Sequence, residues 1–335
     1  MNWSNKTILL TGGTGSFGKA FTKFVLKKLK PKAIRIFSRD ELKQFEMRSE
    51  FNNNPTLRFL LGDVRDKARL YRAIDGADIV VHAAALKQVP AAEYNPSEFI
   101  LTNIIGTQNV ADVSIDLNVD KVMMISTDKA VNPVNLYGAT KLCAEKLVVQ
   151  SNSYRGANKK TKLSVSRYGN VVGSRGSVIP LILQQKKTGE ISLTDERMTR
   201  FWITLEQAID FVTRSMEDMQ GGEIFVPKIP SMKIIDLVNA LGPECKVKII
   251  GTRPGEKIHE VLLNEEEVRS ALDVGDRYVV LPKHISWEGL DWKKGKNLSE
   301  DFIYSSDKND WWLTIKELLK IVKGQENDEE EKAGN

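Results

Sequence analysis

A tyrosine and a lysine four residues apart form the first pattern that could do chemistry. Tyr137 and Lys141 belong to the segment Tyr-Gly-Ala-Thr-Lys, and an i, i+4 spacing places both side chains on one face of a helix. A free tyrosine has a pKa near 10, about three units too high for a general base at neutral pH. Because a neighbouring ammonium favours the phenolate, the pair is expected to supply a phenolate base.

A second reactive group, Thr127, Asp128 and Lys129, follows an apolar strand expected over 121–126. Ligands of doubly wound sheets bind beyond the carboxyl ends of the strands. There, Thr127 could donate a hydrogen bond to a substrate hydroxyl, while Asp128 and Lys129 offer an acid and a base side by side. The alternative is that Asp128 and Lys129 only pair with each other in a surface loop.

A glycine-rich turn near the start of the chain predicts a dinucleotide site. It follows a strand expected over 7–11 and opens a helix expected over 16–29. Such a turn lets the backbone approach a pyrophosphate, and the N–H groups at the helix N-terminus face its charge. The cofactor contacts expected here are Thr11, Gly12, Gly15, Ser16, Phe17 and Gly18.

The end of the next strand, expected over 33–37, indicates which dinucleotide binds. NAD enzymes usually carry an Asp or Glu at this point. Here the chain has Ser38 and Arg39, with Lys43 one helical turn further on. Two cations and a hydroxyl suit a 2′-phosphate, so the sequence predicts NADP. Asp40, included among the cofactor contacts, could instead cap the helix expected over 40–51.

The third and fourth strands are expected to complete the cofactor site. Asp63 and Val64 follow the strand over 57–61 and could meet the adenine. Ala83 and Ala84 follow the strand over 78–82, where small side chains leave room for a ligand. His82 is expected to pack at its strand end rather than to carry protons.

Alternating strands and helices predict an α/β fold, a Rossmann-type doubly wound parallel sheet with a smaller mixed α/β substrate-binding lobe. We expect an NADP-binding domain over 1–168. Residues 169–323 are expected to form mainly the lobe, with some segments returning to the first domain. The tail over 324–335 is acidic and expected to be disordered. Further elements are expected over 96–117, 137–154 and 163–167.

Composition excludes several classes of protein. The net charge is only +5, with no basic block of the kind that nucleic-acid binders carry. Two distant cysteines argue against a disulfide framework or a metal site. No run of about 20 apolar residues is present, and no signal peptide fits before the first strand. A cytoplasmic enzyme without a membrane or nucleic-acid partner is therefore expected.

Taken together, these residues resemble the extended short-chain dehydrogenase/reductase family, which modifies nucleotide sugars. The resemblance covers nearly the whole chain and includes the segment Arg-Pro-Gly-Glu over 253–256. Thr-Asp-Lys-Ala-Val-Asn-Pro over 127–133 is similar to the UDP-N-acetylglucosamine 4,6-dehydratases, whereas dehydratases that retain the C5 configuration typically carry Thr-Asp-Glu. The retained Tyr137 and the short chain favour the inverting group, which begins pseudaminic acid synthesis for the decoration of flagellins.

The resemblance implies a hydro-lyase with tightly bound NADP, a UDP-sugar substrate and a homo-oligomeric state, either dimer or hexamer. The implied product is UDP-2-acetamido-2,6-dideoxy-β-L-arabino-hex-4-ulose. After Tyr137 assists oxidation at C4, Lys129 with a lowered pKa would remove the C5 proton, and Asp128 would protonate the departing 6-hydroxyl. The substrate contacts implied, mostly by resemblance, are Lys87, Asn170, Arg175, Thr194, Arg200, Arg253 and Glu256.

Two other functions stay open. A UDP-sugar 4-epimerase would share the cofactor site and Tyr137 but would not need an acid–base pair directed at C5 and C6. A non-catalytic NADP-sensing protein would need neither, and the intact Thr127, Tyr137 and Lys141 argue against it.

Overall fold

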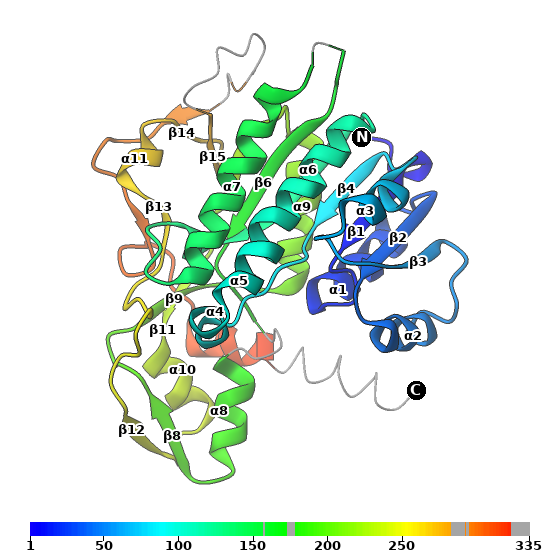
Figure 1. Ribbon diagram of the computed structural model, residues 1–335. Coiled ribbons are helices and arrows are strands. Elements are labelled where there is room, and N and C mark those ends of the chain that lie inside the picture. The colour runs from blue at the N-terminus through cyan, green and yellow to red at the C-terminus, as the bar shows by residue number, and fades with distance from the viewer. Residues whose placement is uncertain (157, 173–177, 283–291, 293–294, 323–335) are drawn as a thin grey trace.

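The computed structural model describes residues 1–156, 158–172, 178–282, 292 and 295–322. Arg175 and the tail over 324–335 lie outside these residues. Within the described residues the chain builds one large sheet, with strand order β16-β14-β15-β10-β6-β5-β4-β1-β2-β3. Helices cover both of its faces, and a smaller lobe lies below one end (Figure 1).

Six parallel strands from the first half of the chain form the doubly wound part of this sheet. The chain reverses its winding direction between β1 and β4, and this reversal opens the crevice in which such sheets bind ligands. The fold predicted from the sequence is therefore confirmed. The six strands are β1 (Thr7–Thr11), β2 (Ala33–Ser38), β3 (Leu57–Leu61), β4 (Ile79–His82), β5 (Lys121–Thr127) and β6 (Lys162–Tyr168).

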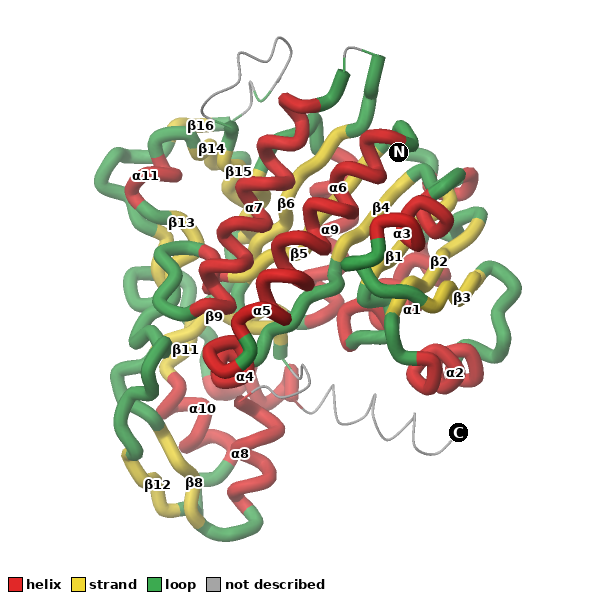
Figure 2. The backbone as a smooth tube through the Cα atoms, viewed as in Figure 1, coloured by secondary structure: helices red, strands yellow, loops and turns green. Residues whose placement is uncertain are grey.

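The helices that cover the parallel strands lie in two layers, as the tube view shows (Figure 2). On one face α3 (Lys67–Ile74), α6 (Gly106–Asp116) and α7 (Leu136–Tyr154) lie side by side. On the other face α1 (Ser16–Lys28) lies beside α9 (Leu205–Asp218). Because both faces are covered, the strands are apolar along their length, and Ile8, Leu9 and Leu10 of β1 are fully buried. Helix α2 (Glu41–Glu50) follows β2.

The helical region expected over 96–117 is not one regular helix. It comprises α5 (Pro96–Phe99), the π-helical turn η2 (Ile100–Ile105) and α6, and is preceded by α4 (Val89–Tyr94). Asn103 in η2 bonds both the N–H and the C=O of Leu86, at 2.8 and 2.9 Å. The π-helical turn thus fixes the chain that follows β4, which periodicity alone does not reveal.

The second half of the chain both extends the large sheet and forms the lobe. Strand β10 (Ile224–Pro227) runs parallel to β6, while β15 (Arg277–Val280) and β14 (Ala271–Asp273) add antiparallel strands. At this edge of the large sheet β16 (Lys296–Asn297) pairs with β14. A separate two-stranded sheet consists of β13 (Val261–Leu263) and β17 (Tyr304–Ser305), and α11 (Glu265–Val268) follows β13. The division expected at residue 168 stays a prediction.

The lobe has its own apolar core, which includes Ile182, Trp202, Leu237 and Leu318. Its helices are α8 (Val178–Lys186), α10 (Ile234–Leu241) and a segment over 315–322. Its strands are β7 (Asn170–Val171), β8 (Glu190–Leu193), β9 (Thr199–Ile203), β11 (Ser231–Lys233) and β12 (Lys246–Ile249). In the described part of the chain, no helix has the length and apolar character to cross a bilayer.

Candidate active site

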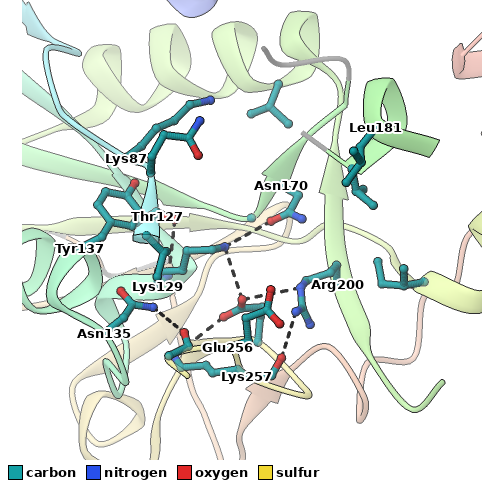
Figure 3. Close-up of a pocket in the computed structure, with 18 of the residues that line it drawn as sticks. Lys87, Thr127, Lys129, Asn135, Tyr137, Asn170, Leu181, Arg200, Glu256 and Lys257 are labelled. Carbon is teal, nitrogen blue, oxygen red and sulfur yellow. Dashed lines mark hydrogen bonds and ion pairs between the residues drawn. The ribbon is translucent and has the colours of Figure 1, made fainter. Parts of the chain in front are cut away.

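A cavity of about 740 Å³ lies between the carboxyl ends of the parallel strands and the lobe. Figure 3 shows that Tyr137, Thr127 and Lys129 face it from the sheet side, and Asn170, Arg200 and Glu256 from the lobe. It brings together many of the predicted site residues. Those lining it are Gly12, Gly15, Ser16, Phe17, Gly18, Ala83, Lys87, Thr127, Lys129, Tyr137, Lys141, Asn170, Thr194, Arg200, Arg253 and Glu256.

The glycine turn forms a cradle that no other residue type would fit. Gly12 has φ +66°, and a Cβ on it would lie 2.8 Å from the Ala84 nitrogen. A Cβ on Gly18 would lie 2.3 Å from the Gly13 carbonyl oxygen. Gly15 is the N-cap of α1 and supplies no side-chain acceptor, which leaves N–H groups of the first turn for a ligand. This cradle fits the pyrophosphate of a dinucleotide.

Thr11 and His82 support the floor of this cradle. The Thr11 hydroxyl lies 2.7 Å from His82 Nδ1, and His82 Nε2 lies 3.0 Å from the Thr107 hydroxyl. The Ala84 N–H donates to Thr11 Oγ1 at 3.3 Å. Burial, with the Lys141 charge, lowers the pKa of His82 to about 3. A neutral imidazole with a hydrogen bond at each ring nitrogen fits the expected packing role of His82.

Two exposed cationic side chains, Arg39 and Lys43, lie where β2 ends and α2 begins. Asp40 caps α2 by accepting from the Lys43 N–H at 3.0 Å, and its carboxylate lies 2.7 Å from Lys43 Nζ. Arg39 lies 3.6 Å from Asp63. The Arg39 and Lys43 side chains are each 48% exposed, so both can turn toward an anion. Ser38 is buried, and its hydroxyl accepts from Gln44 at 3.0 Å.

Asp63 and Val64 both have structural partners at the end of β3. Asp63 accepts two side-chain hydrogen bonds from Arg65, at 2.9 and 2.7 Å. Burial disfavours the charged carboxylate, but the Arg65 guanidinium outweighs it and lowers the pKa of Asp63. Val64 is buried against Gly106, whose absent Cβ leaves room for it.

The helix that carries Tyr137 is anchored to the lobe at its first turn. Asn135 caps α7 by accepting from the Gly138 N–H at 2.8 Å, and its amide donates to the Gly255 carbonyl at 2.8 Å. A Cβ on Gly138 would lie 2.3 Å from the Lys129 carbonyl oxygen. The missing side chain therefore lets α7 approach the turn that holds Lys129.

Tyr137 and Lys141 lie on the buried face of α7, as the spacing predicts. Burial raises the pKa of Tyr137 to about 12, although the nearby Lys129 ammonium favours the phenolate. Burial lowers the pKa of Lys141 to about 8, opposed by Glu145. Lys141 Nζ donates to the Ile125 carbonyl at 2.8 Å. The expected lowering by a neighbouring ammonium thus comes from Lys129, and in the protein alone it does not offset burial.

Asp128 and Lys129 are not a surface pair, so that alternative is wrong. Asp128 is fully buried, and Lys129 lines the cavity. They do bond to each other, with Lys129 Nζ 2.9 Å from Asp128 Oδ1, and the same oxygen accepts from the Thr127 hydroxyl at 2.9 Å. Asp128 Oδ2 has no hydrogen-bond partner among the described residues.

The expected lowering of the Lys129 pKa is also wrong for the protein alone. Burial disfavours the ammonium, but the carboxylates of Asp128 and Glu260 outweigh burial and raise the pKa of Lys129. Burial raises the pKa of Asp128. Transfer of one proton along the 2.9 Å hydrogen bond converts this ion pair into a neutral acid and a neutral amine. The pair can therefore reach the protonation state that an elimination requires.

Most of the predicted substrate contacts occupy the lobe side of the cavity, whereas Lys87 follows β4 on the sheet side. Asn170 accepts from Lys129 Nζ at 3.4 Å. Arg200 donates to the carbonyls of Thr199, Ile258 and Lys257 at 2.7–2.9 Å, which fixes its guanidinium at the cavity wall. Burial, together with the Lys129 charge, lowers the pKa of Lys87.

The segment over 253–256 forms a tight turn. The Glu256 N–H donates to the Arg253 carbonyl at 3.1 Å, and the Arg253 N–H donates to a Glu256 carboxylate oxygen at 3.2 Å. Arg253, Glu256 and Thr194 all line the cavity. Arg175 lies outside the described residues.

Sequence reasoning missed three residues of the site: Asn135, Lys257 and Glu260. Asn135 stands two residues before the helix expected over 137–154, so the capping preference of Asn could have identified it. Lys257 and Glu260 follow the Arg-Pro-Gly-Glu segment, but no spacing rule connects them to Lys129. Only the fold brings them together.

A doubly wound sheet with a glycine cradle and a Tyr–Lys helix at its ligand-binding edge defines the extended short-chain dehydrogenase/reductase class, as the sequence resemblance predicted. A family model described as "Polysaccharide biosynthesis protein" matches residues 8–282, and the chain belongs to this family.

Curated relatives cover nearly the full chain. An inverting UDP-N-acetylglucosamine 4,6-dehydratase of Campylobacter jejuni is 52% identical over 96% of this chain and 98% of its own. A UDP-glucose 4-epimerase of Rickettsia canadensis is 46% identical over 82% of each chain. Both similarities are high, and the dehydratase covers more of the chain.

Solved structures support the same fold. Pen from Bacillus thuringiensis superposes with a TM-score of 0.88 at 37% identity, covering 97% of this chain and 99% of its own. DesIV, a dTDP-glucose 4,6-dehydratase from Streptomyces venezuelae solved with NAD and TYD bound, has a TM-score of 0.65 at 22% identity, covering 75% and 86%. The second similarity concerns the fold alone.

Proposed function

We propose that this protein is a C5-inverting UDP-N-acetylglucosamine 4,6-dehydratase, a hydro-lyase that uses NADP. The observation that carries the proposal is the pairing of Lys129, which lines the same cavity as Tyr137 and Lys141, with the buried carboxylate of Asp128 directly behind it. An enzyme that only oxidises and reduces C4 needs Tyr137, but not an acid and a base beside it. The 52% identical dehydratase supports the same function.

Each residue has a role that its surroundings permit. Tyr137, assisted by Thr127 and by the charge of Lys129, removes the proton of the 4-hydroxyl. A bound nicotinamide dinucleotide supplies the reversible oxidation that makes the C5 hydrogen acidic. Lys129 as the neutral amine takes that hydrogen as a proton, and Asp128 as the neutral acid protonates the 6-hydroxyl, which leaves as water. Lys141, close to its carbonyl partner in β5, positions the nicotinamide ribose.

We assign the remaining substrate and cofactor contacts because of where these residues lie in the cavity. Asn170, Arg200, Arg253 and Lys87 would bind the diphosphate and the sugar, with Thr194 and Glu256 near the uridine; all six line the cavity. Gly12, Gly15 and Gly18 would hold the pyrophosphate, because Gly12 and Gly18 admit no Cβ and Gly15 is the N-cap of α1.

The setting of the reaction is also proposed. The inverting group that the sequence resembles places the product in pseudaminic acid synthesis and flagellin glycosylation. Its UDP-sugar substrate and the free thiols of Cys143 and Cys245 favour the cytoplasm. Partly exposed Ile100, Leu101 and Ile105 on η2 favour a homo-oligomer.

Proton NMR of the purified protein with UDP-N-acetylglucosamine in D₂O tests the function. A dehydratase creates a C6 methyl signal and introduces deuterium at C5, and the coupling constants report the C5 configuration. A 4-epimerase, the second candidate because of the 46% identical relative, gives a C4 epimer and no methyl group. Binding of NADP without conversion of any UDP-sugar would instead favour a sensing protein.

Replacement of Arg39 by alanine should separate the two dinucleotides. Arg39 is half exposed, and its contact with Asp63 is long at 3.6 Å, so its guanidinium can turn from Asp63 to a 2′-phosphate. We expect NADP affinity to fall about tenfold to a hundredfold, as befits the loss of one charge-assisted contact, with NAD affinity nearly unchanged. Calorimetric titration of both nucleotides measures this, and equal losses for the two would contradict the NADP assignment.

A further inference from the structure

Glu260 is a buried carboxylate that the proposed reaction does not yet use. It precedes β13 and is only 2% exposed. Its Oε1 lies 3.4 Å from Lys129 Nζ and 3.7 Å from Arg200 Nε, and its Oε2 lies 3.8 Å from Lys257 Nζ. Oε2 accepts no hydrogen bond from the described residues. Because an unpaired buried carboxylate is costly, these cations must account for its charge.

Lys129 is held from both sides of the cavity. Asp128, its neighbour in the chain, lies 2.9 Å from Nζ, while Asn170 and Glu260 each lie 3.4 Å away. In Figure 3, the Lys129 side chain extends from the sheet side toward Asn170 and Arg200 of the lobe. Among the described residues, two of the three acceptors of Lys129 thus come from the second half of the chain, and they fix where the amine points.

We infer that Glu260 is the positioning residue of Lys129, holding its amine toward the substrate and stabilising the positive charge that forms on it. This inference rests on the proposed function. In the elimination the C5–H bond breaks and an N–H bond forms on Lys129. The electron pair becomes the C5–C6 double bond, and the C6 hydroxyl leaves as water with a proton from Asp128. Lys129 becomes cationic as Asp128 becomes anionic.

A fixed carboxylate beside the amine lowers the cost of that cation. Preorganised charges aimed at where charge develops are among the largest contributors to catalysis, and a buried carboxylate beside a catalytic base is a known way to stabilise its cationic form. Asp128 cannot serve both as acid and as permanent counter-charge. Glu260 can serve as the permanent counter-charge. Burial opposes its negative charge, but Lys129, Arg200 and Lys257 outweigh burial and lower the pKa of Glu260.

A competing role is that Glu260 only holds Arg200 and Lys257 for the substrate diphosphate. The two roles differ in what they change. A partner of the base changes kcat and its pH dependence, whereas a partner of the binding cations changes KM and UDP affinity. The charged or titratable groups that face Lys129 are Asp128, Glu260, Arg200, Lys257, Lys87 and Tyr137.

The test is the pH profile of methyl formation for Glu260→Gln, with UDP-N-acetylglucosamine as substrate. The reacting pair of Asp128 and Lys129 holds one proton, and a neighbouring carboxylate raises the pKa at which the doubly protonated pair reaches that state. Removal of the carboxylate should therefore move the rising limb of kcat to lower pH by about one unit or more. At the plateau kcat should fall about a hundredfold, with KM changed less than about threefold. Glu260→Asp keeps the charge, so its rising limb should stay at the wild-type pH. Its kcat should be about tenfold higher than that of Glu260→Gln.

The matched control is Glu265→Gln, at an exposed carboxylate in α11, which should leave both the rate and the profile unchanged. An unshifted limb in Glu260→Gln, or a loss confined to KM and to UDP affinity by calorimetry, would overturn the inference. If the glutamine variant does not fold, Glu260→Asp decides: a kcat equal to that of the wild type, with the carboxylate withdrawn by one methylene, contradicts a positioning role.

A measurement that needs no turnover separates this inference from the proposed function. Competitive labelling of lysines with acetic anhydride, followed by mass spectrometry, reports the pH at which Lys129 becomes a free amine. Labelling should begin at lower pH in Glu260→Gln than in the wild type. A wild-type protein that forms no methyl group would refute the dehydratase, and with it the base, whereas unshifted labelling would refute Glu260 as the partner of Lys129.

Discussion

Lys129→Met should remove methyl formation, lowering its rate by about a factor of 10³. Methionine keeps the length of the side chain but cannot take the C5 proton. Oxidation at C4 depends on Tyr137, so the variant should still convert bound substrate to the 4-ketone. A single-turnover experiment should therefore show an absorbance rise near 340 nm that persists, without a methyl signal by NMR.

The same variant leaves two buried carboxylates, Asp128 and Glu260, without their ammonium. Removing one partner of a buried ion pair typically costs about 3–5 kcal/mol, so the free energy of unfolding must be measured beside the rate. Lys187→Met, at an exposed lysine after α8, is the matched control and should change neither. Unchanged methyl formation in Lys129→Met would refute Lys129 as the base.

Tyr137→Phe should stop the reaction one step earlier. Loss of a general base typically costs about 10²–10⁴ in rate, and here the loss falls on C4 oxidation itself. No persistent absorbance rise should appear, in contrast to Lys129→Met. UDP affinity measured by calorimetry should stay within about twofold, because the substitution removes a single hydroxyl and leaves the charged groups in place.

The pH dependence gives this prediction a sign. Burial raises the pKa of Tyr137 to about 12, so the phenol is protonated at neutral pH and its reacting form increases as the pH rises. The single-turnover rate of C4 oxidation should therefore increase with pH in the wild type and show no such increase in Tyr137→Phe. Tyr94→Phe, at an 86% exposed tyrosine, is the control, and a profile that rises equally in Tyr137→Phe would contradict the phenolate assignment.

The local elements were predictable because each depends on nearby residues. The strand over 7–11 and the helix that begins at Ser16 agree with β1 and α1 to within one residue. The Tyr137–Lys141 spacing correctly predicted one buried helix face. The π-helical turn within 96–117 was not predictable, because it depends on how Asn103 bonds the distant Leu86.

The pKa values were the weakest expectations, and the reason is physical. A pKa depends on burial and on every charge within a few ångströms, and both are set by residues far away in the chain. Lys129 was expected to have a lowered pKa and to react as a neutral amine. Instead Glu260, from a segment of the lobe, helps to hold it as an ammonium. Its basicity is thus governed by proton sharing with Asp128 rather than by burial alone.

The sequence by itself determined the doubly wound sheet, the glycine cradle and which residue types could act as acid and base, because strand patterning, turn glycines and i, i+4 spacing are local properties. Only the tertiary structure decided that Asp128 is buried while Lys129 lines the cavity, that Asn135 connects the catalytic helix to the lobe, and that Glu260 lies against the amine. Those relations join residues more than a hundred positions apart. They follow from how the lobe closes over the sheet, which no local pattern specifies.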